Sequence, residues 1–232
     1  MSPPSRHRGL VCALGILGAH NLIQNFVLRE TGYVTGNLTV SAVTVGIGRS
    51  SGASWDEMGL GRPELEASSR VGGIAAAVAA AGAIAAMAHP RTRSFLRDDR
   101  AQVTGPGEIA RRALIRFPLG TAMFEEIAFR GVLPALMPGG TWRADALAAG
   151  VFALWHLVPT ARVQAGNPTS RGRPGRHRIA GVLAGSTAAG VAGFGLSRLR
   201  RRTGSLVAPW MVHASVNSMA FLAGVTAQHI KD

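Results

Sequence analysis

Long uncharged runs dominate the pattern of polar and apolar positions along this chain. Four runs contain no Asp, Glu, Lys or Arg, and each approaches or exceeds the roughly 20 residues that a membrane-spanning helix needs. These runs are residues 9–28, 71–88, 179–197 and 205–227. Helices in the core of a soluble domain rarely repeat this pattern so often in a short chain. The pattern therefore predicts helices that cross a lipid bilayer.

Weaker apolar stretches complete the predicted architecture. Residues 1–232 are predicted to form a single all-α integral-membrane domain, a polytopic bundle of about seven transmembrane helices within a range of about six to eight. The predicted spans are residues 9–28, 33–48, 71–88, 113–137, 144–160, 179–197 and 205–228. The second span is short and rich in Thr, Ser and Gly, so re-entrant and interfacial placements stay open for it.

The composition agrees with a membrane protein. Hydrophobic residues make up 47% and charged residues only 16% of the 232 residues, and the mean hydropathy is +0.20. The formal net charge of +13 would indicate nucleic-acid binding in a soluble protein. Here the arginines gather between the apolar runs, as in residues 91–100, 171–178 and 198–202, which is typical of charge that faces anionic lipid. We therefore expect the lipid bilayer as a partner and no nucleic acid.

One predicted span, residues 113–137, carries three charged side chains. It contains TAMFEEIAFRGVLP at residues 121–134. A charge at bilayer depth is costly unless it is paired or hydrated, and such residues commonly serve function. Glu126 and Arg130 are four residues apart and predict an ion pair, whereas Glu125 projects about 100° away and is left available for chemistry. The alternative is that the pair only ties helices together and Glu125 marks a water-facing end.

Two later spans carry polar residues at the same spacing. In VFALWHLVP, Phe152 and His156 lie four residues apart. In PWMVHASVNSM, His213 and Asn217 repeat this spacing. A single histidine on an apolar face is more often a hydrogen-bonded packing residue than a catalyst. Polar groups on three separate spans favour a shared site instead.

These residue types can activate water. A carboxylate beside an imidazole takes a proton from water, and a second imidazole with an amide donates hydrogen bonds to the oxyanion that forms on an attacked carbonyl. The same side chains could instead bind a metal, because Glu125, His156 and His213 match the glutamate and two histidines of catalytic zinc sites. The residues alone leave both routes open.

Other conspicuous side chains have plainer interpretations. His20 has no polar companion at a useful spacing, so it is expected at a loop or a helix end. Trp155 is expected to be an interfacial or packing residue.

The ordered motifs resemble those of a known family. They are EE-xxx-R at Glu125, Glu126 and Arg130, F-xxx-H at Phe152 and His156, and H-xxx-N at His213 and Asn217. This set resembles the CPBP family, which comprises CAAX prenyl proteases and bacteriocin-processing or immunity proteins and is also called the Abi or Rce1-like family of intramembrane proteases. GSLVAPWMVHASVN, which ends at Asn217, and WDEMGL at residues 55–60 are similar to further family features. The motif-bearing protease core is about residues 113–220.

The resemblance implies a helical-bundle intramembrane endopeptidase of the glutamic type, which hydrolyses a peptide bond at or near the membrane surface. In such an enzyme Glu125 would be the general base on water, with His156 assisting. His213 and Asn217 would form the oxyanion hole.

The resemblance also implies the surroundings of this site. Glu126, Arg130 and Phe152 would support it. No cofactor is favoured, and a divalent metal such as zinc is the alternative. The expected partner is a peptide or protein substrate, met in a bacterial cell membrane. Two other functions stay open: a non-catalytic membrane scaffold or bacteriocin-immunity protein of the same fold, and a small transporter that uses Glu125 and Glu126 as a proton relay.

Overall fold

The computed structural model describes residues 3–61, 65–89, 92, 96, 102–103, 105–167, 170 and 174–230. Within these ranges the chain is helical and contains no strand, so the predicted all-α fold class is confirmed. Most of the Arg-rich segment 91–100, and residues 171–173 of the next Arg-rich segment, lie outside the described residues.

The helices lie at the predicted positions, with ends that differ by up to seven residues from the predicted boundaries. The first three are α1 (Pro3–Phe26), α2 (Glu30–Ser50) and α3 (Leu65–Ala88). A continuous helical run follows, made of α5 (Pro106–Arg111), η2 (Arg112–Met123), α6 (Phe124–Glu126), η3 (Ile127–Val132) and α7 (Leu133–Leu136), in which η2 and η3 are π-helical. The remaining helices are α8 (Gly140–Trp155), α9 (Leu157–Gly166), α11 (Gly175–Thr203) and α12 (Val207–His229).

Each predicted span coincides with a helix or a continuous helical run in the described part of the chain. Among the described residues, four helical segments are long and apolar enough to cross a membrane, namely Ser5–Phe26, Leu65–Ala88, Gly140–Gly166 and Gly175–Thr203. The count of about seven spans therefore stays a prediction. The other long helices carry more polar residues, such as Asn37 and Thr44 of α2, and these two are fully buried inside the bundle.

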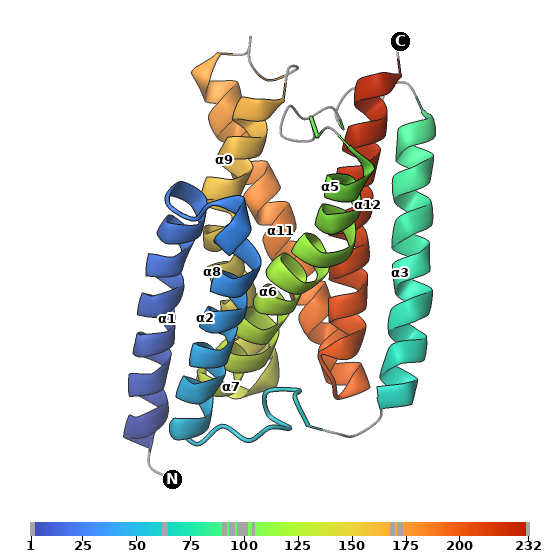
Figure 1. The fold of residues 1–232 in the computed structure, drawn as a ribbon. Coiled ribbons are helices and arrows are strands. Elements are labelled where there is room, and N and C mark those ends of the chain that lie inside the picture. The colour runs from blue at the N-terminus through green and yellow to red at the C-terminus, as the bar shows by residue number, and fades with distance from the viewer. Residues whose placement is uncertain are drawn as a thin grey trace.

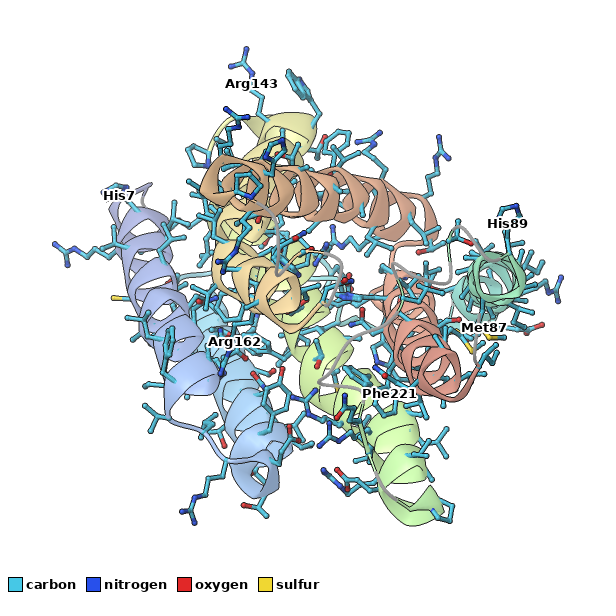
Figure 2. All side chains as sticks on the ribbon, turned by 90° about the horizontal axis from the view of Figure 1, so that it is seen from above. His7, Met87, His89, Arg143, Arg162 and Phe221 are labelled. Carbon is cyan, nitrogen blue, oxygen red and sulfur yellow. The ribbon has the colours of Figure 1, made fainter. Side chains whose placement is uncertain are left out.

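The helical run from α5 to α7 crosses the middle of the bundle. Figure 1 shows it in green between the α1–α2 pair and the α12–α3 pair, with α8, α9 and α11 behind. Helix α3 contacts mainly α12, and Figure 2 places Met87, near the end of α3, at the edge of the bundle. The Ile74 and Val78 residues of α3 are 64% and 68% exposed. Apolar exposure on so long a helix suits contact with lipid.

The loop after α2 turns back under the bundle and fixes the start of α12 (Figure 1). Arg200 of α11 donates hydrogen bonds to the backbone carbonyls of Asp56 (3.0 Å) and Glu57 in this loop. The amide of Leu206 donates to the carbonyl of Gly59 at 3.0 Å. Helix α12 begins at the next residue. These bonds therefore fix its position along its own axis, and with it the level at which its later side chains enter the centre of the bundle.

Gly131 lies where η3 passes this loop. A Cβ at Gly131 would lie 2.9 Å from the carbonyl oxygen of Met58. We predict that Gly131→Ala lowers the free energy of unfolding by roughly 1–3 kcal/mol, because the added methyl group displaces packed backbone. Thermal unfolding in detergent measures the loss. Gly150→Ala in α8 is the control, since a Cβ there meets nothing within 4 Å, and equal stability of the two variants would contradict the close contact.

Candidate active site

Three parts of the fold bring the sequence motifs together. The central run carries Glu125 and Glu126 on α6 and Arg130 on η3. Helix α8, which ends in the FALWH motif, packs on η3 and α11, and α12, which carries the HASVN motif, packs on η2. The site is thus built from segments that are far apart in the sequence, and the packing of α8 and α12 on the central run defines it.

Glu126 and Arg130 form the ion pair that their spacing predicts. Arg130 Nη1 lies 3.3 Å from Glu126 Oε1, and each of the two side chains is 1% exposed. His213 Nδ1 lies 2.7 Å from the same carboxylate oxygen. A single oxygen atom therefore joins α6, η3 and α12. Since each charge is removed from solvent, the acid and the guanidinium would each be costly to bury alone.

Glu125 has a different set of partners. Its Oε1 accepts a 3.0 Å hydrogen bond from Trp155 Nε1, and its Oε2 lies 3.5 Å from His213 Nε2. Among the described residues, Oε2 has no hydrogen-bond partner, and Glu125 is only 5% exposed. Buried polar atoms are almost always hydrogen-bonded. Glu125 Oε2 can therefore accept one further hydrogen bond.

Phe152 and Gly193 shape the space that Arg130 occupies. The guanidinium carbon lies 3.9 Å from the centre of the Phe152 ring, a cation–π distance, and Arg130 Nε donates to the Gly193 carbonyl at 3.4 Å. A Cβ at Gly193 would lie 2.7 Å from Arg130 Nη2 and 2.8 Å from the Phe152 ring. This position of α11 therefore needs glycine, and the Phe152 ring packs against the guanidinium of Arg130.

A cavity of about 770 Å³ lies beside Glu125. His156 and Asn217 line the same cavity, which thus brings together residues from all three motifs. Arg162 of α9 and Phe221 of α12 also line it, and Figure 2 labels both in the view from above. This volume is within the range of small-molecule and peptide pockets.

His156 stands where α8 gives way to α9. Its Nδ1 lies 2.9 Å from the backbone carbonyl of Phe152, and the two rings lie 4.3 Å apart between centres. A carbonyl oxygen can only accept, so Nδ1 carries the proton in this bond. In the neutral ring the lone pair is then on Nε2.

Ion pairs surround the outer part of the cavity. Arg116 Nε lies 2.8 Å from Glu30 Oε2. Glu108 accepts hydrogen bonds from Arg111 and Arg112, and these bonds, that from Arg111 above all, lower the pKa of Glu108 to about 2. The Glu108 carboxylate therefore stays charged at neutral pH.

The three candidate metal ligands do not meet at one point. In the part of the chain that the structure describes, no group of three His, Cys, Asp or Glu side chains is placed to hold a metal ion. Glu125 and His213 approach each other, whereas His156 bonds the Phe152 backbone. The arrangement does not fit the three-ligand zinc set, and metal independence stays a prediction for experiment.

The sequence interpretation did not predict the contacts of two aromatic residues near Glu125, Trp155 and His20. Trp155, expected only as an interfacial or packing residue, is 6% exposed and donates to Glu125. His20, expected at a loop or a helix end, is instead buried within α1, and its Nε2 lies 2.7 Å from Asn37 Oδ1. Each partner is on another helix, so no local spacing signals these contacts.

Comparison with known proteins bears directly on this site. Residues 109–219 match the family described as Type II CAAX prenyl endopeptidase Rce1-like. This match supports membership of the chain in the Rce1-like family. The matched region contains all the motif residues from Glu125 to Asn217, so it confirms the resemblance that the sequence motifs carry. Neither a curated protein nor a solved structure matches the chain.

The Rce1-like match, together with the long apolar helices, supports an integral membrane protein with an intramembrane CAAX-type protease fold. Peptide is accordingly the class of substrate that the family acts on. Helices α1, α2 and α3 precede the matched region. The contact of His20 with Asn37 nevertheless lies in those helices, close to the site.

Arg130 offers a test of the buried charges. We predict that Arg130→Met lowers the free energy of unfolding by roughly 3 kcal/mol, because it leaves the Glu126 carboxylate buried without its cation. Arg162→Met, at an exposed arginine, should change stability by less than about 0.5 kcal/mol. Both are measured by thermal unfolding in the same detergent. If the unpaired Glu126 carboxylate causes the loss, adding Glu126→Gln to Arg130→Met should restore part of the stability. No recovery would contradict this explanation.

Proposed function

We propose that the chain is a metal-independent intramembrane endopeptidase of the Rce1-like family in which Glu125 activates water. The observation that carries the proposal is the position of the Glu125 carboxylate. Glu125 lines the cavity, and its buried Oε2 has no hydrogen-bond partner among the described residues. A water molecule in the cavity can donate to that oxygen, and the oxygen can take its proton.

The proposed reaction is hydrolysis of one peptide bond. Glu125 Oε2 removes a proton from water while the water oxygen attacks the carbonyl carbon of the substrate. The resulting tetrahedral intermediate carries its negative charge on the former carbonyl oxygen. Glu125 then returns the proton to the leaving nitrogen, the C–N bond breaks, and a carboxylic acid and an amine are formed.

His156 is proposed to assist at the water. Its Nδ1 is occupied by the Phe152 carbonyl, so the acceptor Nε2 of the neutral ring is available to orient a water hydrogen. His156 and Glu125 line the same cavity. Two acceptors on a single water would direct one of its oxygen lone pairs towards the substrate.

His213 and Asn217 are proposed to stabilise the oxyanion. They lie four residues apart on α12 and share a face. His213 Nδ1 bonds Glu126, which leaves Nε2 as the donor when the ring is protonated at both nitrogens.

The substrate proposed for this site is a peptide segment at or near the membrane surface of a bacterial cell. The cavity combines apolar walls, including Phe117, Pro159 and Phe221, with the polar residues of the motifs. Such walls suit apolar side chains on either side of the bond that is cut.

Cleavage of a peptide library by the reconstituted full-length protein tests this function. Glu125→Gln, which keeps the shape of the side chain but is a poor base, should lower kcat by about 10²–10⁴-fold. Glu66→Gln is the matched control, because this glutamate has a side chain that is 90% exposed on α3, and it should cleave like the wild type. Full activity of Glu125→Gln would overturn the mechanism, and an inactive wild type would favour a scaffold or immunity protein.

Metal removal gives a separate prediction. Since no three candidate ligands are placed around one point in the described residues, cleavage should continue at an unchanged rate after treatment with a strong chelator. Loss of activity that returns on addition of zinc would replace the metal-independent mechanism with zinc-activated water.

A further inference from the structure

Trp155 fixes which oxygen of Glu125 is available for chemistry. The indole N–H can only donate, and it donates to Glu125 Oε1 at 3.0 Å. A hydrogen bond to a carboxylate is stronger than one between neutral groups. With Oε1 occupied, Oε2 is the atom left beside His213. The indole therefore determines the rotation of the carboxylate about its own axis.

The ring of Trp155 is held by packing on three sides. Phe124 and Phe129 of the central run lie 5.5 Å and 5.3 Å from it between ring centres. His20 of α1 stacks on it at 6.4 Å with an interplanar angle of 29°. Packing of this kind permits one orientation of the indole, so its N–H has a fixed direction.

Asn21 of α1 holds the backbone of Trp155. In a helix, the carbonyl of residue 155 would accept from the amide of residue 159, but Pro159 has no N–H. Asn21 Nδ2 donates to this carbonyl instead, at 3.0 Å, and Asn21 is 8% exposed. The Asn21 side chain thus replaces the backbone N–H donor that Pro159 lacks, just after the end of α8.

Asn37 of α2 in turn orients His20. Asn37 Nδ2 donates to the Tyr33 carbonyl at 3.0 Å, so its Oδ1 is the acceptor for His20 Nε2 at 2.7 Å. His20 is 4% exposed and Asn37 is fully buried. The contact locks the imidazole that stacks on the indole, which extends the network into a second helix outside the matched region.

We infer that α1 and α2 belong to the catalytic apparatus, and that Trp155 is the positioning residue through which they hold the general base. This inference rests on the proposed role of Glu125. Residues His20 and Asn21 act on the reaction only through the indole, and the indole acts only through the Glu125 carboxylate. The positioning network therefore begins before residue 109, where the family match starts.

Trp155→Phe tests the inference, because it keeps an aromatic ring and removes the N–H. In the reconstituted full-length protein, with a peptide that the wild type cleaves, kcat should fall by about tenfold to a hundredfold. KM should stay within about twofold of the wild type, since the indole does not line the cavity. The control is Trp210→Phe, which removes an indole N–H that donates to the Pro118 carbonyl at 2.8 Å, and it should retain the wild-type kcat.

A double-mutant cycle separates positioning from a loss of stability. Asn21→Leu should lower kcat in the wild-type background and have little further effect in Trp155→Phe, because both changes release the same carboxylate. The inference is overturned if the fold-loss in kcat of the double variant equals the product of the two single losses. It is also overturned if Trp155→Phe has an unchanged kcat. Glu125→Gln keeps the two proposals apart. If Glu125→Gln is inactive while Trp155→Phe is fully active, only the positioning role of Trp155 fails. If Glu125→Gln is fully active, the proposed function itself fails.

Discussion

The buried contact of Glu126 with Arg130 and His213 is the constraint on which the rest of the structure depends. Two adjacent acids in an apolar bundle are tolerated where cations or a hydrated cavity reach them. Arg130 comes from the next helical turn, but His213 must be carried in by α12. The position of α12, the absence of a side chain at Gly193 and the Phe152 ring against the guanidinium all serve this one cluster. The remaining acid, Glu125, is then available beside the cavity.

A second constraint comes from proline in helices that have little access to water. Each proline leaves a carbonyl one turn earlier without its donor, and in an apolar bundle a neighbouring helix must supply one. In the π-helical register of η2, the donor for Ala113 would be Pro118, and the Ser218 hydroxyl bonds the Ala113 carbonyl at 2.7 Å instead. Asn21 does the same for Trp155. Replacement donors thus join α12 to η2 and α1 to α8, and these two junctions flank the site.

Local spacing explains what the sequence could predict. Two pairs are four residues apart, Glu126 with Arg130 and Phe152 with His156. Any α-helix, in water or in lipid, brings the members of such a pair together. The contacts of Glu125 with Trp155 and of His20 with Asn37 depend on how two helices are rotated against each other, which no single segment encodes. The span count stayed a prediction for a related reason. Polar residues that are buried inside the bundle lower the hydropathy of α2, and burial can be seen only after the helices have packed.

The position of α12 has a consequence for biosynthesis. His213 and Asn217 are translated after every other residue of the site, and α12 seats between α3 and the η2 segment that were inserted before it. A nascent chain that has placed α1 to α11 in the bilayer carries both glutamates but neither of the groups that α12 supplies. Docking of α12 therefore completes the buried cluster, because it brings His213 to a Glu126 carboxylate that until then has only Arg130.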